Sequence, residues 1–223
     1  PGLVRYRMLP QGVTPDGFDL LSPGWSPPPA SLQASYVGQV IRLEAHHTVV
    51  EVQRDPWRLL VRDASGRPVL QEMPQDLNAR GLPQSQPTGF TENAQGPAAS
   101  RITLRLEPDE RFLGLGEKGT ALDKRGQRIT CWNRNPYGPG TELAYKNIPF
   151  LVSSRGYGLF LNDTRRSTWD LGCTSNFACT IEVEGPYLDL FIILGDSLKD
   201  ILGKYADLTG HAPLPPRWSF GVW

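Results

Sequence analysis

The 223-residue sequence has little cysteine and histidine, no excess charge and no long apolar segment. Its three cysteines, Cys131, Cys173 and Cys179, cannot all pair with one another, and their spacing is not that of a zinc site. The phosphate-binding loop, the HExxH motif and the GxSxG elbow are missing as well, so we predict no metal and no cofactor. Because so few cysteines are typical of a reducing compartment, we predict a cytoplasmic chain, with a Cys173–Cys179 disulfide as the alternative.

The charge balance excludes two classes of partner. Lysine plus arginine and aspartate plus glutamate both number 23, so the formal net charge at pH 7 is zero. This removes the usual electrostatic argument for nucleic acid or an anionic membrane and favours a neutral substrate. No apolar run approaches the roughly 20 residues that span a bilayer, and the first residues lack the pattern of a signal peptide. We therefore predict neither nucleic acid nor membrane as a partner.

Turn-forming residues, in contrast, are abundant: the chain has 23 glycines and 21 prolines, with short apolar runs between them. This distribution predicts an all-β protein built from antiparallel strands. The expected strands cover residues 40–44, 48–53, 57–62, 68–71, 102–106, 148–152, 157–162, 167–171, 179–183 and 187–194. Residues 1–35 are expected to be irregular, with a short edge strand near 18–21, and residues 78–100 to form a long surface loop. A helix capped by Ser197 and ended by Gly210 should follow the last strand.

The most informative stretch covers residues 112–170. It holds a strand end with Gly114 and Gly116, and a polar loop of residues 133–145 that follows Trp132. The loop and its flanks combine the flat faces of Trp132, Tyr137 and Tyr145 with amide and guanidinium donors. Sugars present a matching mixture of C–H faces and hydroxyl groups. The alternative is a solvated connector whose tryptophan belongs to the core.

Five pieces of the sequence resemble one known family. They are FLGLGE at 112–117, WNRN at 132–135, YKNIPF at 145–150, RGYGLFLND at 155–163 and PPRWSFGVW at 215–223. In order and spacing they resemble the N-terminal β-sandwich domain of the retaining α-glycosidases of glycoside hydrolase family thirty-one, which includes α-glucosidases and α-xylosidases. The WNR and YKNIPF pieces are most similar to the α-xylosidase branch.

This resemblance implies a fold and a domain division. The fold is an antiparallel β-sandwich of the galactose-mutarotase-like supersandwich type, with one C-terminal linking helix. Residues 1–35 would be an irregular N-terminal segment, 36–195 the sandwich, 196–216 the helix and linker, and 217–223 the first strand of a truncated catalytic (β/α)8 barrel. In the family both catalytic aspartates lie in the barrel, beyond Trp223. No residue here is therefore assigned to catalysis, and the chain should be inactive alone.

The resemblance also implies a substrate-binding site. In the family the long loop reaches over the barrel mouth, which assigns Trp132, Asn133, Arg134 and Asn135 to substrate binding. The usual carboxylate falls at Asn135; alternatively Glu142 supplies the charge. The implied function is that of a non-catalytic N-terminal domain of an α-glycosidase acting on terminal α-linked glucosides or xylosides. Its partners would be the substrate, its own barrel and possible further copies. The alternative is a stand-alone carbohydrate-binding sandwich.

Overall fold

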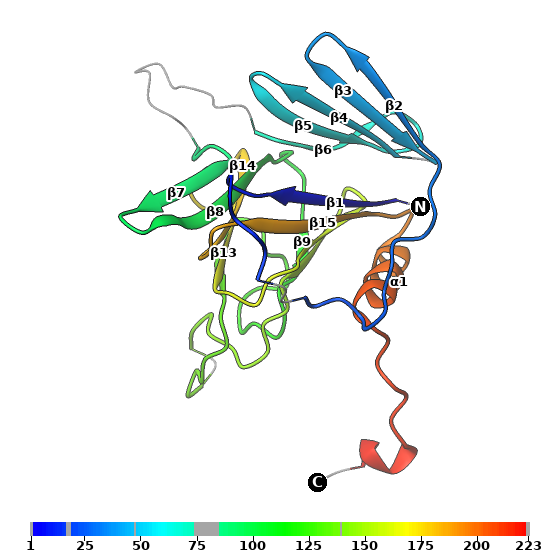
Figure 1. Cartoon of the computed structure of the whole chain (residues 1–223). Coiled ribbons are helices and arrows are strands. Elements are labelled where there is room, and N and C mark those ends of the chain that lie inside the picture. The colour runs from blue at the N-terminus through cyan, green and yellow to red at the C-terminus, as the bar shows by residue number, and fades with distance from the viewer. Residues whose placement is uncertain (1, 17–18, 47, 74–84, 139, 222–223) are drawn as a thin grey trace.

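In the part of the chain that the structure describes, fifteen strands form three antiparallel sheets, and one α-helix and a short 3-10 helix follow them (Figure 1). The computed structural model describes residues 2–16, 19–46, 48–73, 85–138 and 140–221. The first sheet has the order β1 (Leu3–Met8), β15 (Leu188–Leu194), β12 (Tyr157–Leu161), β11 (Phe150–Ser153) and β9 (Phe112–Gly114). The second has the order β10 (Arg128–Cys131), β13 (Ser167–Leu171), β14 (Ala178–Val183), β8 (Gly96–Arg105) and β7 (Gly89–Asn93). The third follows the chain: β2 (Leu32–Val37), β3 (Val40–Ala45), β4 (Thr48–Arg54), β5 (Trp57–Arg62) and β6 (Pro68–Gln71).

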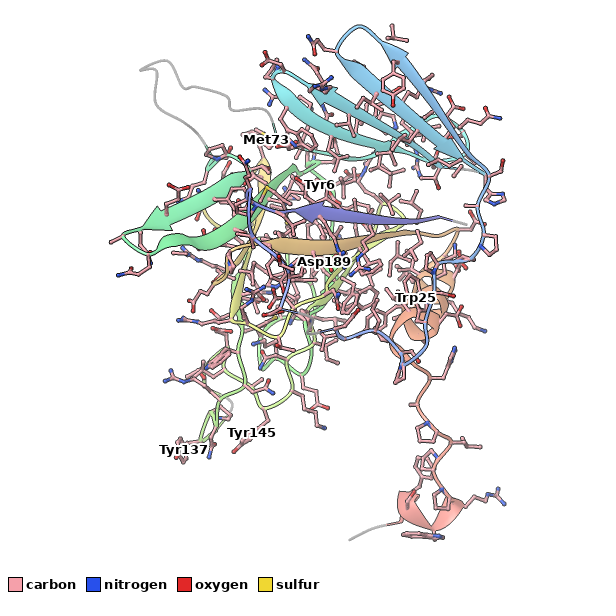
Figure 2. The ribbon with its side chains drawn as sticks, viewed as in Figure 1. Tyr6, Trp25, Met73, Tyr137, Tyr145 and Asp189 are labelled. Carbon is pink, nitrogen blue, oxygen red and sulfur yellow. The ribbon has the colours of Figure 1, made fainter. Side chains whose placement is uncertain are left out.

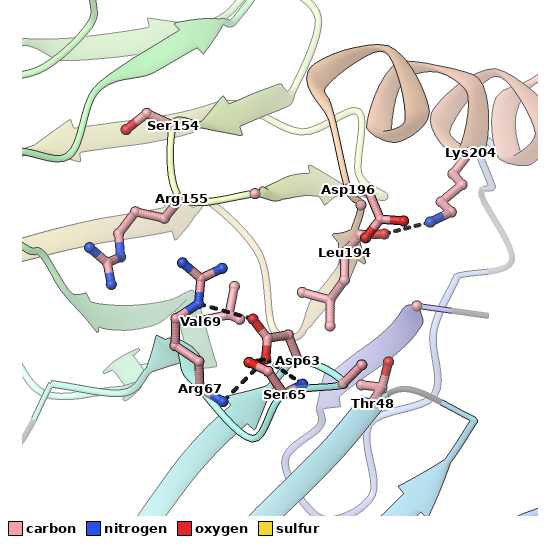
Figure 3. Close-up of a pocket in the computed structure, with 14 residues that line it drawn as sticks. Thr48, Asp63, Ser65, Arg67, Val69, Ser154, Arg155, Leu194, Asp196 and Lys204 are labelled. Carbon is pink, nitrogen blue, oxygen red and sulfur yellow. Dashed lines mark hydrogen bonds and ion pairs between the residues drawn. The ribbon is translucent and has the colours of Figure 1, made fainter.

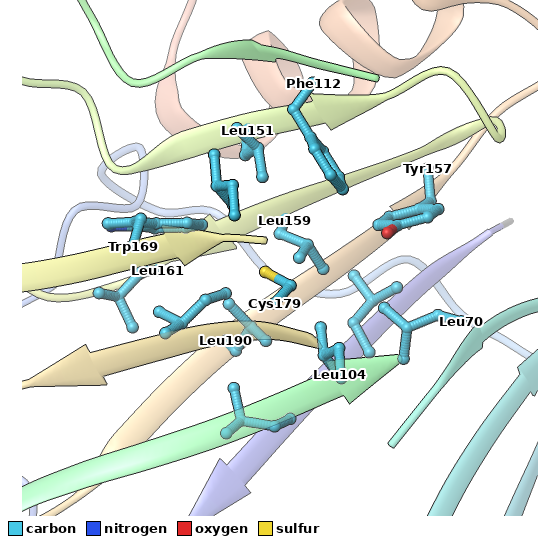
Figure 4. Close-up of a cluster of buried hydrophobic side chains, with 14 of the residues drawn as sticks. Leu70, Leu104, Phe112, Leu151, Tyr157, Leu159, Leu161, Trp169, Cys179 and Leu190 are labelled. Carbon is cyan, nitrogen blue, oxygen red and sulfur yellow. The ribbon is translucent and has the colours of Figure 1, made fainter. Parts of the chain in front are cut away.

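The main core lies between the first two sheets and extends to the third. Alternate residues of each strand point inward, as the period of two requires. Figure 4 shows Phe112, Leu151 and Leu159 of the first sheet beside Leu104 and Trp169 of the second, all almost completely buried. Leu59, Val61 and Leu70 bring the third sheet onto the same core. The predicted all-β antiparallel sandwich is confirmed.

A second apolar cluster covers the opposite face of the first sheet. Helix α1 (Leu198–Thr209) packs there through its buried residues Ile201 and Leu208, against Phe160 and Phe191. Strand β15 is therefore buried on both faces, which explains its sequence LDLFIIL, apolar at every position except Asp189. The helix begins and ends as predicted: the Ser197 side chain accepts a hydrogen bond from the Asp200 amide, and Gly210 with φ of 103° follows the last turn.

The N-terminal segment departs from the expectation of irregular structure. Residues Leu3–Met8 form β1, which pairs antiparallel with β15 at the edge of the first sheet. Its sequence LVRYRM alternates apolar and basic residues, so Val4, Tyr6 and Met8 pack on the core while Arg5 and Arg7 face the other side. The prediction that residues 1–35 are irregular is therefore wrong for β1, which pairs with the distant strand β15, and for the start of β2, which pairs with β3.

Two further expectations need correction. The long loop predicted at 78–100 contains β7 and the first half of β8, which meet in a hairpin with Gly96 in the left-handed region. The residues before Ser85 in that loop lie outside the described residues, as does part of the edge strand expected near 18–21; Leu20 and Leu21 belong to no strand. The barrel strand expected at 217–223 is instead the short 3-10 helix η1 (Arg217–Phe220) as far as residue 221.

Candidate functional site

Two glycines at the end of β9 form the base of the polar loop. Gly114 and Gly116 have φ values of 127° and 86°, and the segment 146–150 lies directly against them. The amide of Leu115 donates to the Phe150 carbonyl at 2.9 Å, and the Glu117 amide donates to the Lys146 carbonyl at 3.0 Å. A Cβ atom on either glycine would collide with these carbonyl oxygens. The FLGLGE motif therefore needs glycine at both positions to hold the YKNIPF motif.

A buried lysine anchors the loop from below. The Lys118 side chain is fully shielded, and its Nζ donates to the carbonyl oxygens of Thr130 at 2.7 Å and Glu142 at 3.1 Å. The Glu142 carboxylate lies 3.3 Å from the same ammonium group and accepts a hydrogen bond from the Thr130 amide. The ammonium group of Lys118 thus joins Thr130, just before the loop, to Glu142, near its end. This contact fixes the two sides of the loop relative to each other.

The two strands of the loop are also linked directly. Asn133 forms a parallel bridge with Ala144, and the Arg134 amide donates to the Ala144 carbonyl at 3.0 Å. The Oδ1 atom of Asn133 accepts from the amide of Asn147 at 3.2 Å and from its Nδ2 at 2.8 Å. The asparagine of the WNRN motif and the asparagine of the YKNIPF motif thus hold each other in place.

The tip of the loop carries exposed aromatic side chains. Asn135 Oδ1 accepts a hydrogen bond from the Tyr137 amide at 2.9 Å, which closes a tight turn in which Tyr137 has φ of 50°. The Tyr137 side chain is 93% exposed, and Tyr145 on the returning strand is exposed as well. Figure 2 shows both tyrosines projecting at the far end of the molecule from the third sheet. The tip therefore offers flat apolar surfaces to a partner or ligand.

Trp132 separates two small cavities. The larger, of about 250 Å³, is lined by Trp132, Asn133 and Asn147 together with Asp163 and Arg165. Among the described residues the Asn147 Oδ1 atom has no hydrogen-bond partner, so an acceptor is free at this cavity. The smaller, of about 170 Å³, is lined by Thr130, Trp132, Arg134, Glu142, Leu143 and Arg166. Trp132 thus borders two spaces, each of the size of one or two small ring systems.

An ion pair, Asp163–Arg165, lines the same cavity as Trp132. Arg165 donates to both carboxylate oxygens of Asp163, with Nη2 at 2.5 Å from Oδ2 and Nε at 3.0 Å from Oδ1. Its guanidinium group also lies 4.3 Å from the ring centroid of Tyr187. These contacts leave Asp163 compensated, so it is suited to positioning Arg165 and poorly suited to acting as a catalytic acid or nucleophile.

The cysteines take no part in chemistry at this site. All three thiols are free, so the Cys173–Cys179 disulfide is not formed. Burial raises the pKa of the Cys131 thiol, which also lines the larger cavity, to about 11. Burial likewise raises the pKa of Cys179. Because the thiolate is the nucleophile, neither residue is activated near neutral pH.

The four predicted substrate-binding residues are consecutive in sequence, but they do not all line the same cavity. Trp132 and Asn133 line the larger cavity, Trp132 and Arg134 line the smaller, and Asn135 lines neither because it closes the tip turn. Glu142, the alternative source of charge, has its carboxylate turned to Lys118. Asn147 and Lys118 were not predicted as site residues. Asn147 lies inside the quoted YKNIPF motif, and Lys118 directly follows FLGLGE, so the motifs marked the right segments without assigning these roles.

An antiparallel β-sandwich with a third sheet on its core and one long anchored loop defines a β domain of the galactose-mutarotase type. Residues 1–170 match the family model described as the glycosyl hydrolase 31 N-terminal galactose mutarotase-like domain, and the chain belongs to this family. Among the described residues, helices fall short of the length and apolar character needed to cross a membrane.

Similar proteins are larger enzymes. The chain is 42% identical over 123 residues to the α-xylosidase XylQ of Lactiplantibacillus pentosus, which covers 55% of this chain and 16% of that protein. It is 32% identical over 189 residues to α-glucosidase 2 of Bacillus thermoamyloliquefaciens, covering 82% of this chain and 22% of that protein. The chain therefore spans about a fifth of the length of these relatives.

A solved structure supports the same fold. The Flavobacterium johnsoniae GH31 dextranase in complex with glucose superposes with a TM-score of 0.74 at 26% sequence identity. The match covers 85% of this chain and 22% of the dextranase chain. The similarity therefore extends over most of the three-sheet domain.

Proposed function

We propose that the chain is the non-catalytic N-terminal domain of a retaining α-glycosidase that acts on terminal α-linked xylosides or glucosides, and that its polar loop forms one wall of the substrate pocket. The observation that carries this proposal is the anchoring of the loop. Lys118, Asn133 and Asn147 fix its base, while Trp132 and the tip tyrosines remain exposed. A preorganised aromatic and amide surface binds a ligand at a lower entropic cost than a loose one.

The chemistry of the loop suits a neutral sugar. Aromatic faces pack against the C–H surface of a pyranose ring, and the amide of Asn135 and the guanidinium of Arg134 can hydrogen-bond hydroxyl groups. Asn135 carries no charge where the resembled enzymes have a carboxylate. An amide both donates and accepts, so it can bind a hydroxyl group in either direction, but more weakly than a charged acceptor. We therefore infer a substrate preference different from that of aspartate-bearing members.

The catalytic groups belong to the barrel and not to this domain. A retaining glycosidase needs two carboxyl groups about 5 Å apart across the scissile bond. The carboxylates at the loop form ion pairs and are therefore poorly suited to these catalytic roles: Glu142 is paired with Lys118, and Asp163 with Arg165. Figure 1 shows the segment after α1 extending to the same side of the molecule as the polar loop. Its exposed Leu214, Trp218 and Phe220 support docking against a catalytic domain on that side.

The partners and the cellular location follow from the same proposal. The partners would be an α-linked glucoside or xyloside and the enzyme's own barrel, with the cytoplasm as the location. The second candidate is a stand-alone carbohydrate-binding module. It is favoured by the two cavities beside Trp132, which exist without a second domain. The two candidates differ in what they predict for the isolated chain: the module binds sugar well, whereas a single wall of a larger pocket binds it weakly.

Kinetics of the complete enzyme test the proposal. Trp132→Ala and Arg134→Ala should lower kcat/KM on an aryl α-xyloside by about tenfold or more, the loss expected when one good contact to the transition state is removed. Asn135→Asp should change the ratio of kcat/KM between aryl xyloside and aryl glucoside. Tyr36→Ala is the matched control, because Tyr36 is an exposed aromatic residue of β2 outside the loop. If all three loop variants kept the kcat/KM of the control, the loop would be a plain connector.

A further inference from the structure

A cavity of about 600 Å³ lies where three parts of the fold meet (Figure 3). The turn between β5 and β6 forms one side, the turn between β11 and β12 a second, and the junction of β15 with α1 the third. Its polar lining includes Thr48, Asp63, Ser65, Arg67, Arg155 and Asp196. None of its lining residues borders the two cavities beside Trp132. It is therefore a separate candidate site.

Arg67 is held in this cavity with its terminal nitrogens unused. Its Nε donates to Asp63 Oδ2 at 3.0 Å, and its amide donates to Asp63 Oδ1 at 3.1 Å. Ser65 donates to the same Oδ1 through both its hydroxyl and its amide, which lowers the pKa of the Asp63 carboxyl. Asp63 is thereby fixed and in turn fixes Arg67. Within the described part of the chain the two terminal nitrogens of Arg67 make no hydrogen bond.

Arg155 approaches the cavity from the opposite turn. Its side chain is mostly buried, and Nη1 lies 3.9 Å from the exposed Asp109 carboxylate, which is too long for a hydrogen bond. Figure 3 shows the guanidinium groups of Arg67 and Arg155 directed to the same end of the cavity. The charge of Arg67 is compensated by Asp63 and its side chain is 58% exposed, whereas the acidic neighbour of Arg155 is the exposed Asp109 at 3.9 Å. Their free N–H groups match the paired oxygens of a carboxylate or phosphate.

The rest of the cavity offers neutral hydrogen-bonding groups and one acceptor. Thr48 is only 7% exposed, and its Oγ1 finds no hydrogen-bond partner among the residues described. Lys204 also lines the space, but its Nζ is occupied by the Leu194 carbonyl at 2.8 Å and by Asp200 at 2.7 Å. Asp196 places a carboxylate at the α1 side. A ligand with hydroxyl groups beside its anionic group would complement this lining.

We propose that the cavity binds a small hydroxylated molecule with an oxyanion, a carboxylate or a phosphate, held between Arg67 and Arg155. The volume is within the usual range for small-molecule sites, roughly 300 to 1,000 Å³, and exceeds the need of an inorganic ion. A sugar acid or a sugar phosphate has the required chemistry. The inference does not rest on the proposed glycosidase role, since the two sites share no residue. Because the ligand would touch the third sheet, the first sheet and the start of α1, its binding would join them.

Titration calorimetry of the chain tests this proposal with three probes: glucuronate, glucose 6-phosphate and glucose. We expect either anionic sugar to bind at least about tenfold more tightly than glucose, because a charge-assisted pair is lost with the neutral probe. Binding of the phosphate alone or of the carboxylate alone would each support the proposal and identify the oxyanion. Equal or absent binding of all three would overturn it.

Variants locate the site. Arg155→Gln and Arg67→Gln should each weaken binding of the anionic sugar about tenfold or more, and Arg155→Lys should restore only part of it because the planar fork is lost. Arg105→Gln is the control, since this arginine is exposed, lies 3.6 Å from Glu107 and lines neither this cavity nor the two beside Trp132. Unchanged melting temperatures would show that each variant is folded. If Arg67→Gln does not fold, the affinity of Arg155→Gln alone tests the proposal. Equal affinity of Arg155→Gln and Arg105→Gln for the anionic sugar would refute the proposal.

Discussion

The guanidinium group of Arg5 binds both carboxylate oxygens of Asp189, with Nε at 2.9 Å from Oδ1 and Nη2 at 2.6 Å from Oδ2. The two residues are 184 positions apart, and the pair joins the first strand of the chain to the last strand of the sandwich. Asp189 is 4% exposed and also accepts a hydrogen bond from Asn162 Nδ2 at 3.0 Å. The pair therefore links β1, β15 and β12 on the face that α1 shares.

We predict that Asp189→Ala lowers the free energy of unfolding by about 2 kcal/mol or more, because a hydrogen bond to a charged group contributes about 1.5 to 3 kcal/mol. The change leaves the partly exposed Arg5 and Arg7 and the Asn162 donor without their shared buried acceptor. Urea unfolding followed by tryptophan fluorescence measures the change. Glu184→Ala is the control, because this carboxylate and its partner Arg166 are both exposed, so the loss should stay below about 0.5 kcal/mol. Similar losses in the two variants would contradict the structural role of the pair.

The Arg5–Asp189 pair also shows which part of the fold could not be predicted from the sequence, namely the pairing of strands that are distant along the chain. Local signals located most strands: the runs 57–62 and 167–171 were predicted with the bounds that the structure has, and Ser197 and Gly210 cap α1. Strand β1 was missed although LVRYRM alternates, because its partner β15 lies at the other end of the domain. A short alternating run next to proline and glycine becomes a strand only when a distant edge accepts it.

In the candidate site too, local motifs could be recognised in the sequence, whereas contacts between distant residues could not. The motifs WNRN and YKNIPF located the loop, but the contacts that hold it depend on tertiary proximity. Thr130 lies 12 positions and Glu142 lies 24 positions after Lys118, and no secondary-structure period connects them. Likewise, the cavity between Arg67 and Arg155 joins turns of different sheets, which single-sequence patterns do not bring together. Secondary structure was therefore predictable from local signals, and pairing of polar groups was not.

We predict that Lys118→Met loosens the polar loop without unfolding the sandwich. The change removes the ammonium group that donates hydrogen bonds to the carbonyl oxygens of Thr130 and Glu142 and that balances the Glu142 carboxylate. Leaving these buried acceptors without a donor costs about 1 to 3 kcal/mol. Amide hydrogen exchange should accelerate at Thr130 and Arg134 while the amides of β15 keep their protection. Lys146→Met is the matched control, because its pair with Glu117 is exposed on both sides. Unchanged exchange in the loop would show that Lys118 does not anchor it.

We predict that only one thiol of the native chain reacts quickly with iodoacetamide at pH 8. Cys173 is exposed, whereas Cys131 and Cys179 are buried, and burial raises the pKa of Cys131 to about 11. Since the thiolate reacts and the thiol does not, both buried cysteines stay unmodified until the chain unfolds. Intact mass and peptide mapping should find one alkylated cysteine in the native chain and three in urea. Cys173→Ser should leave the native chain unmodified; rapid alkylation of Cys131 would mean that the cavity beside Trp132 opens.

We predict that two glycine-to-alanine substitutions change stability in opposite directions. At Gly116 the backbone has φ of 86° and a Cβ atom would overlap with the Lys146 carbonyl, so Gly116→Ala should cost more than about 1 kcal/mol, the typical penalty for a left-handed non-glycine residue, and displace the YKNIPF segment. At Gly203, inside α1, a Cβ atom meets nothing within 4 Å. Gly203→Ala should therefore stabilise the chain by about 0.5 to 1 kcal/mol through helix propensity. Thermal unfolding distinguishes the two, and a Gly116→Ala variant as stable as the parent would mean that segment 146–148 does not lie against the FLGLGE motif.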